Sequence, residues 1–167
     1  MRKMIRNRNG FTLIELMISV VVVGIIAALA TPHLEEAWQR QKFRSDNNNL
    51  MSKIKTARSY AVSTKTSHGI HLGEDMVFTV FRDDVNPGSG SFDEGDEVMS
   101  VDTLAPEFEM LYTDNANGVF MFNSNGSATV SGNGSIYTYA YADNVLSMAN
   151  ITITAATGRA RIDASYY

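Results

Sequence analysis

The feature that most constrains this chain is an apolar run of twenty residues near its start, from Phe11 to Ala30. Only Thr12, Glu15 and Ser19 are polar within this run. A helix of about twenty apolar residues matches the ~30 Å hydrocarbon core of a lipid bilayer. The sequence therefore predicts a transmembrane helix over residues 11–31.

The charges that flank the run predict its orientation. Four basic residues and no acidic residue precede it: Arg2, Lys3, Arg6 and Arg8. Positively charged flanks stay in the cytoplasm, so we expect residues 1–10 there and everything after Pro32 on the other side. The prediction is a single-pass membrane protein whose C-terminal domain lies on the non-cytoplasmic side.

Glu15 is the anomaly within the apolar run. A carboxylate at the centre of a membrane span costs roughly 2.5–3.5 kcal/mol on insertion scales, and less near an end. A cationic partner would offset this cost, and a free amino terminus at Phe11, made by cleavage after Gly10, would supply one. The alternative is that the Glu15 side chain reaches the lipid headgroups unaided.

The first residues resemble a known processing signal. A basic leader ending at Gly10, then Phe11-Thr12-Leu13-Ile14-Glu15-Leu16 and an apolar segment, is similar to the start of type IV prepilins. The resemblance implies cleavage between Gly10 and Phe11 by a prepilin peptidase, and N-methylation of the new Phe11 amino terminus. It also implies that Glu15 acts in assembly by pairing with the amino terminus of a neighbouring subunit.

Two other interpretations of the N-terminus stay open. Ala28-Leu29-Ala30 fits the A-x-A pattern of ordinary signal peptidase, which would release a domain beginning at Thr31. Against this, the apolar run is longer than a usual signal-peptide core and contains Glu15. A plain single-pass anchor would leave the Gly10-Phe11…Glu15 pattern unexplained.

The rest of the chain is long enough for one domain and strongly acidic. Without the span, roughly 135 of the 167 residues remain, sufficient for a hydrophobic core. There is no cysteine, whereas many major pilins carry a C-terminal disulfide; this favours a pseudopilin or minor subunit. The formal net charge is −4 and the leader is basic, so the processed chain is near −8. Such a chain is repelled by nucleic acid and by anionic membranes.

Periodicity predicts an α+β fold in which a long N-terminal hydrophobic helix, pilin-like, packs on an antiparallel β-sheet domain. An amphipathic continuation of the helix is expected over residues 32–66, with Asn47-Asn48-Asn49 as its weak point. Its apolar stripe comprises Phe43, Leu50, Ile54, Ala57 and Ala61. Residues 67–167 should form the β-rich domain. Strands are expected at residues 68–72, 76–81, 98–101, 108–112, 119–122, 136–141, 149–155 and 159–163.

Arg159 and Arg161 are the only basic residues after Arg82. On a strand, residues two apart point to one face. The segment Gly158-Arg159-Ala160-Arg161 resembles the G-R-x-R ending of the GspH/FimT family, which includes a secretion pseudopilin and a minor pilin linked to DNA uptake. The resemblance implies that Gly158, Arg159 and Arg161 contact DNA. Contact with a partner subunit, or local pairing with Asp143 or Asp163, stays open.

Other candidate sites are weaker. The acidic residues of the loop could bind Ca²⁺ but lack EF-hand spacing, so solvated loop charges are the simpler interpretation; they are Asp83, Asp84, Asp93, Glu94, Asp96 and Glu97. His68 and His71 should lie on opposite faces of a strand, and we predict no metal site. Tyr137, Tyr139 and Tyr141 share a face that could stack bases, although a half-buried sheet face explains them more simply. No catalytic motif is present, so neither an enzyme nor a cofactor is predicted.

These observations predict a minor pilin or pseudopilin subunit of the GspH/FimT type, assembled into a type IV-like filament that serves type II protein secretion. The alternative is a DNA-binding minor pilin for DNA uptake, acting through Arg159 and Arg161. The expected partners are other pilin or pseudopilin subunits, prepilin peptidase and the inner membrane, with DNA as a partner in the alternative.

Overall fold

The structure is a computed structural model that describes residues 11–105, 108–115, 117–130, 134–142 and 145–166. The chain divides into two units, one up to Ala37 and one from Trp38 onward. One helix, α1, runs from Leu13 to Thr64 and therefore contributes to both units. All strands follow it, and all belong to the second unit.

The helix α1 is continuous through the asparagine run at Asn47-Asn48-Asn49, so this weak point does not break it. It ends at Thr64, directly before Lys65, whose φ of 61° lies in the left-handed region that terminates helices. In the described part of the chain, no single helix meets the length and hydropathy expected of a membrane span. The segments Leu13–Leu29 and Leu34–Thr64 meet that expectation only when taken together.

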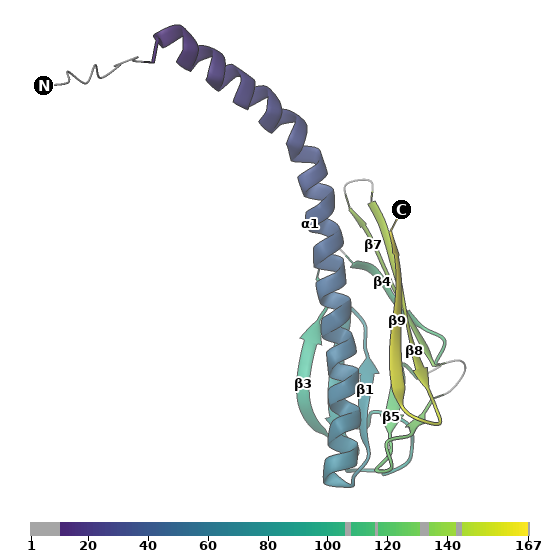
Figure 1. The fold of residues 1–167 in the computed structure, drawn as a ribbon. Coiled ribbons are helices and arrows are strands. Elements are labelled where there is room, and N and C mark those ends of the chain that lie inside the picture. Colours follow the sequence, from purple (N-terminus) through teal and green to yellow (C-terminus); the bar gives the residue numbers. More distant parts are fainter. Residues whose placement is uncertain (1–10, 106–107, 116, 131–133, 143–144, 167) are drawn as a thin grey trace, which may run out of the picture. The chain divides into compact units, whose positions relative to one another are not determined.

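Two antiparallel sheets make up the rest of the second unit (Figure 1). The first sheet has the order β3-β2-β1-β5-β6. Its strands are β1 (His68–Leu72), β2 (Val77–Arg82), β3 (Glu97–Thr103), β5 (Val119–Phe122) and β6 (Ala128–Thr129). The second sheet has the order β4-β7-β8-β9. Its strands are β4 (Phe108–Thr113), β7 (Ser135–Ala142), β8 (Val145–Thr154) and β9 (Arg159–Tyr166).

The second half of α1 and both sheets enclose one hydrophobic core. The predicted stripe of α1 is buried as expected, from Phe43 to Ala61. It meets large apolar side chains of both sheets: Ile70, Phe78, Val80, Phe120 and Phe122 from the first, and Ile136, Ile151 and Ile153 from the second. The predicted α+β fold is confirmed, because one long helix packs with two antiparallel sheets around a shared core.

A smaller apolar cluster lies on the other face of the first sheet, where Phe81, Val119 and Met121 are covered by Phe92. The rings of Phe81 and Phe92 are 4.7 Å apart. Gly69 sits beneath this cluster, and a Cβ there would collide with the Phe81 ring and the Met121 sulfur. Phe92 thus anchors the acidic loop between β2 and β3 on the outer face of the sheet.

The strand predictions are largely confirmed. His68–Leu72 and Val119–Phe122 match β1 and β5 at both ends, and the hairpin from β1 to β2 is present. A turn forms at Asn125-Gly126, with the Gly126 N–H donating to the Asn123 carbonyl at 2.8 Å. The sequence prediction missed β6 because two residues are too short to show a period. It also began β8 four residues late.

Asn47 links α1 to the second sheet inside the core. Its side chain is almost fully buried, its Nδ2 donates to the Phe43 carbonyl at 3.0 Å, and its Oδ1 accepts from the Thr138 hydroxyl at 2.7 Å. Thr138 lies on β7 and is fully buried. The asparagine that weakens the helix by propensity therefore satisfies a buried hydroxyl.

Replacing Asn47 with alanine is expected to lower the free energy of unfolding by about 1–3 kcal/mol, because the Thr138 hydroxyl would be buried without an acceptor. Urea denaturation of the unit from Trp38 onward measures this change. The matched control is Asn48→Ala, at an exposed position on the same helix, which should be neutral or slightly stabilising. Equal effects of the two substitutions would contradict the assigned role of Asn47.

Candidate functional site

The first turn of α1 is defined by Thr12 and Glu15. The Thr12 Oγ1 accepts a hydrogen bond from the Glu15 N–H at 3.3 Å, and the Leu16 N–H donates to the Thr12 carbonyl at 3.2 Å. A threonine followed three residues later by glutamate is a common capping sequence at helix starts. The helix begins at Leu13, with Phe11 and Thr12 between it and the predicted cleavage point. Gly10 lies outside the described residues.

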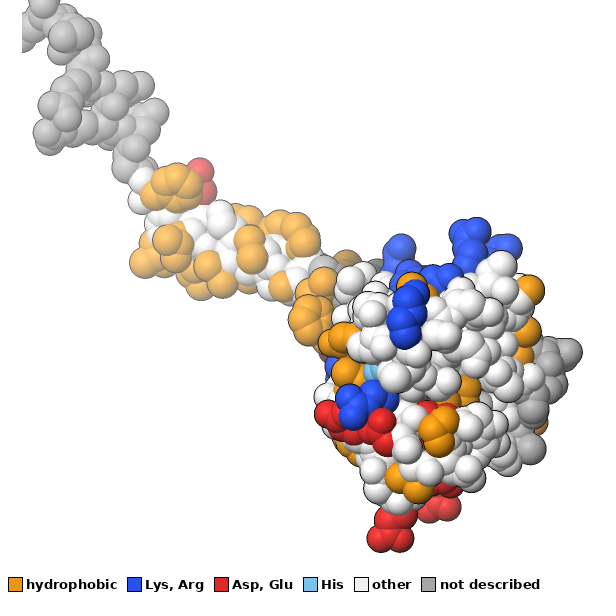
Figure 2. Space-filling model, turned by 90° about the horizontal axis from the view of Figure 1, so that it is seen from below, with side chains coloured by type: hydrophobic (Ala, Val, Ile, Leu, Met, Phe, Trp, Pro, Cys, Tyr) orange, Lys and Arg blue, Asp and Glu red, His pale blue; other side chains and the backbone are white. Residues whose placement is uncertain are grey.

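The N-terminal half of α1 is apolar and uncovered. The side chains of Phe11, Leu13 and Ile14 are 76%, 78% and 64% exposed, and exposed apolar side chains continue to Leu29 (Figure 2). Glu15 is also exposed, and its carboxylate makes no ion pair or hydrogen bond with any residue that the structure describes. An apolar surface of this extent is stable only against lipid or another protein.

The acidic loop between β2 and β3 is organised by the Asp96 carboxylate. Its Oδ1 accepts from the N–H groups of Asp84 and Val85 at 3.0 and 3.1 Å, and its Oδ2 accepts from the Asp93 N–H at 2.9 Å. Burial alone would raise the pKa of Asp96, but the three backbone donors outweigh it and lower the pKa.

The pKa of Asp83, in the same loop, shifts in the opposite direction. Its side chain is buried, and its Oδ2 accepts from the Gly88 N–H at 2.8 Å. Burial, together with the charges of Asp96, Asp93 and Asp84, raises the pKa of Asp83. In the described ranges of the chain, no group of three His, Cys, Asp or Glu side chains is arranged to hold a metal ion.

The two histidines of β1 have separate surroundings. His68 is buried, and its Nδ1 lies 3.0 Å from the Thr66 carbonyl oxygen. The His71 ring packs on Phe92 with centroids 5.2 Å apart, and burial lowers the pKa of His71. Both rings are therefore parts of the packing around the first sheet.

Arg159 and Arg161 project from β9, an edge strand of the second sheet. Both are exposed, whereas the alternating residues Ala160 and Ile162 are half-buried, so the two arginines share one face as predicted. Arg161 Nη2 lies 2.9 Å from Asp163 Oδ1, which confirms local pairing for Arg161. Such an exposed pair adds little stability and leaves the guanidinium accessible. The other candidate acid, Asp143, lies outside the described residues.

Comparisons with known proteins point to one family. A family described as the prokaryotic N-terminal methylation motif matches residues 5–31. The type IV major fimbrial protein FimA of Dichelobacter nodosus is 31% identical over 127 residues, which cover 74% of this chain and 76% of FimA. The chain belongs to the type IV pilin family.

Two further comparisons agree with this assignment. The type IV major pilin protein PilA of Myxococcus xanthus (strain DK1622) is 44% identical over 55 residues, which cover 33% of this pilin and 24% of PilA. The crystal structure of the type IV minor pilin FimU of Pseudomonas aeruginosa (strain PAO1) matches with a TM-score of 0.53 and 17% identity. It covers 75% of this pilin and 90% of FimU, and supports the fold. The named relatives are pilus proteins, which indirectly supports the prediction that this pilin is not an enzyme.

The tyrosines of β7 lie on the outer face of the second sheet. Tyr137 and Tyr139 are half-buried, Tyr141 is exposed, and the Tyr137 ring lies 6.0 Å from that of Tyr112 on β4. Tyr137, Tyr139 and Asp163 are among the residues that line a shallow cavity of about 260 Å³. The simpler interpretation, a half-buried sheet face, fits this arrangement.

Arg58, which no sequence pattern singles out, holds the turn before Arg159 in place. The Arg58 Nε donates to the Gly126 carbonyl at 2.9 Å and to the Thr157 carbonyl at 3.0 Å. Gly158 has φ of 59°, and a Cβ there would collide with the Gly126 carbonyl oxygen and the Arg58 side chain. The glycine of the G-R-x-R segment is thus required for packing in this pilin. No local pattern could reveal a contact across 99 residues.

At pH 7 the free energy of unfolding of the Asp96→Asn variant should be about 1–3 kcal/mol lower than that of the wild type, because an amide NH₂ would face backbone N–H donors. The lowered pKa of Asp96 means that its contribution is present at neutral pH and is lost as pH falls through the folded-state value. The difference between variant and wild type should therefore shrink in acid. Urea denaturation at several pH values checks this.

Asp84→Asn is the control for that experiment, since the Asp84 side chain is exposed and its carboxylate pairs at the surface with Arg82 at 2.8 Å. It should change stability by less than about 1 kcal/mol. A pH-independent effect of Asp96→Asn would show that its carboxylate does not organise the loop.

Proposed function

We propose that this pilin is a structural subunit of a type IV-like filament that assembles through the N-terminal half of α1. The observation that carries the proposal is the uncovered apolar surface of Leu13–Leu29 with a single acid, Glu15, within the segment that matches the N-terminal methylation motif. Cleavage after Gly10 and methylation of Phe11 generate the mature subunit. Residues 11–31 then hold it in the inner membrane, with the domain in the periplasm, until it enters the filament.

Electrostatics gives this assembly its specificity. Lipid tails are as apolar as the helix, so transfer of α1 from lipid to a bundle of like helices gains little from the hydrophobic effect. A carboxylate and an amino terminus attract one another strongly in such a medium, because its effective dielectric constant is low. Pairing of Glu15 with the Phe11 amino terminus of a neighbour removes the isolated charge that burial would otherwise penalise.

The proposal also concerns which filament system the subunit joins, a type II secretion system or a type IV pilus. Two arguments support our assignment to type II secretion, namely the lack of cysteine and the GspH/FimT-like ending. The curated relatives FimA and PilA are named as type IV pilus proteins, which favours a pilus. A minor subunit of a type IV-like filament accommodates both. Co-purification of the chain with sheared pili or with a secretion complex distinguishes them.

Glu15→Ala should leave processing intact but reduce incorporation into filaments at least tenfold, because one ion pair per subunit contact is lost. Processing is measured by gel mobility and incorporation by the fraction of the chain in sheared filaments. Glu35→Ala, an exposed acid farther along α1, is the matched control and should assemble normally. Wild-type incorporation of the Glu15 variant would contradict the pairing.

A second candidate function is DNA binding through β9. It is favoured by the exposure of Arg159 and Arg161 on one face and by the turn at Gly158 beside them, which Arg58 contacts through the Thr157 carbonyl. With two phosphate contacts, the logarithm of the binding constant should fall with the logarithm of the salt concentration at a slope of only about −1.8. Binding should therefore be weak and confined to low salt. The chain's acidic net charge opposes it further.

The double variant Arg159→Gln plus Arg161→Gln should abolish any shift of duplex DNA in a gel run at low salt. The matched control, Arg44→Gln plus Lys55→Gln, removes the same charge from exposed positions on α1 and should still bind. Absence of binding by the wild type at low salt removes this candidate. Equal loss in both variants would show that only net charge matters.

A further inference from the structure

The outer face of the second sheet carries six side chains that the proposed filament contact does not use. They stand in two neighbouring rows across β7, β8 and β9, each row made of register partners: Tyr137, Asn150, Asp163 and Tyr139, Met148, Ser165. All six are among the residues that line the shallow cavity of about 260 Å³. The register of three strands therefore assembles this cavity.

The cavity has an aromatic wall. Tyr137 and Tyr139 are half-buried and lie two residues apart on one strand, so their rings stand on the same face. Tyrosines are concentrated here, since four of the seven in the chain lie on this face: Tyr112, Tyr137, Tyr139 and Tyr141. Tyrosine rings are rigid and amphipathic, and they recur at recognition surfaces because they offer contact area at little loss of conformational entropy.

Polar atoms without partners complete the cavity. Asn150 Oδ1 is buried and accepts no hydrogen bond from any described residue, which is unfavourable for a buried acceptor. The Asn150 side chain as a whole is partly exposed, so a turn of its amide presents this oxygen to a ligand. Asp163 Oδ1 accepts from Arg161 at 2.9 Å, whereas no described residue donates to its Oδ2. The cavity therefore offers hydrogen-bond acceptors that lack donors within the described part of the chain.

The charges around the cavity disfavour an ionic ligand. Arg161 balances Asp163 at its rim. The chain is otherwise acidic, with no lysine or arginine between Arg82 and Arg159, and it repels anions such as nucleic acid. A protein partner would need about 800 Å² of surface, and a cavity of this size supplies only a small part of that. A neutral ligand with hydroxyl donors and an apolar face fits best.

A sugar ring has these properties. In a pyranose whose hydroxyl groups are equatorial, the two faces present C–H bonds and the edge presents hydroxyls. The C–H face packs on an aromatic ring, while the hydroxyls donate to carboxylate and amide oxygens. Linkage of such rings in the β-1,4 manner produces a flat ribbon, which follows the surface of a sheet better than the coiled chain of an α-1,4 linkage.

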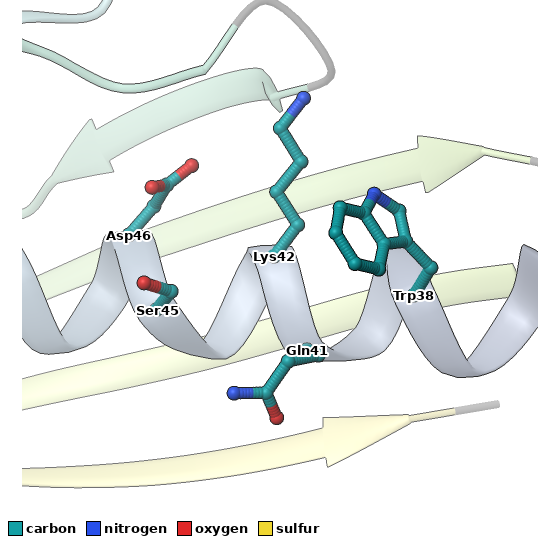
Figure 3. Close-up of a pocket in the computed structure, with 5 residues that line it drawn as sticks. All are labelled: Trp38, Gln41, Lys42, Ser45 and Asp46. Carbon is teal, nitrogen blue, oxygen red and sulfur yellow. The ribbon is translucent and has the colours of Figure 1, made fainter.

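The larger pocket on α1 offers less to such a ligand. It has a volume of about 360 Å³ and is lined by Trp38, Gln41, Lys42, Ser45 and Asp46 (Figure 3). Its single ring comes from Trp38, and its two charged residues already interact within the chain. The cavity on the second sheet is therefore the better ligand site.

We propose that the cavity formed by Tyr137, Tyr139, Asn150, Asp163 and Ser165 binds one unit of a neutral β-1,4-linked oligosaccharide. The tyrosine rings hold the C–H face of the sugar, Asn150 and Asp163 accept from its hydroxyls, and the Ser165 hydroxyl donates or accepts at the rim. This site goes beyond the proposed filament function and does not depend on it.

Three trisaccharides test the site with the full chain in micelles of a detergent that has no sugar headgroup. They are the β-1,4-linked trimers of N-acetylglucosamine and of glucose, and the α-1,4-linked trimer of glucose. Saturation-transfer NMR should show contact with the ring C–H protons of at least one β-linked trimer, and severalfold weaker contact with the α-linked one. Binding of the N-acetylglucosamine trimer alone identifies a glycan that carries acetamido groups, and equal binding of both β-linked trimers shows that ring shape suffices.

Three results would overturn the inference and leave the proposed filament function standing. One is the absence of saturation transfer to all three trimers. Another is equal transfer to the α-linked trimer, because the flat shape of the ligand would then have no effect. The third is protection of the tyrosines by a single-stranded thymidine oligonucleotide instead of a sugar, which would show that this face stacks bases.

Substitutions assign the contacts. Tyr139→Ala should weaken binding about tenfold, because the ring that packs on the sugar is removed, whereas Tyr139→Phe keeps the ring and should bind nearly as the wild type does. Asp163→Ala, at an exposed position on an edge strand, removes an acceptor without altering the core and should weaken binding severalfold. Tyr60→Ala, at an exposed position on α1, is the matched control and should bind normally. Unchanged affinity in both Tyr139→Ala and Asp163→Ala overturns the inference.

Discussion

A lone carboxylate on an otherwise apolar helix is the constraint on which this pilin depends. The surface of Leu13–Leu29 cannot stay in water, and Glu15 is unfavourable in lipid. The arrangement that relieves both problems places like helices side by side and provides a cation for each acid. In the proposed filament, a free amino terminus at Phe11 would be such a cation, and it would connect cleavage of the leader to assembly.

The second half of the same helix has a different task, because it is one wall of the domain core. Its apolar stripe joins the two sheets, and Asn47 and Arg58 extend polar contacts from it to β7 and to the turn before β9. These contacts fasten both sheets to the second half of α1. Side chains on the outer surface of α1, Trp38 among them, are exposed.

The elements with a clear period could be predicted from sequence, and the long-range polar contacts could not. The apolar stripe of α1 and strands β1 and β5 follow from spacing alone, since burial imposes a period of 3.6 or 2. Helix propensity marks Asn47 as a weak point of α1, yet its side chain accepts a hydrogen bond from Thr138, 91 residues away. Arg58 and Gly158 form a similar distant contact. The exposure of Arg159 and Arg161 was predictable from alternation, whereas the packing role of the neighbouring glycine was not.

The most direct test of the central claim is the intact mass of the chain extracted from membranes of its native host. The account predicts a polypeptide that begins at Phe11 and carries one added methyl group on its amino terminus. A chain that still retains residues 1–10 would contradict it, because Glu15 would have no amino terminus at Phe11 with which to pair. A chain that begins at Thr31 would also contradict it, because it lacks Glu15 altogether.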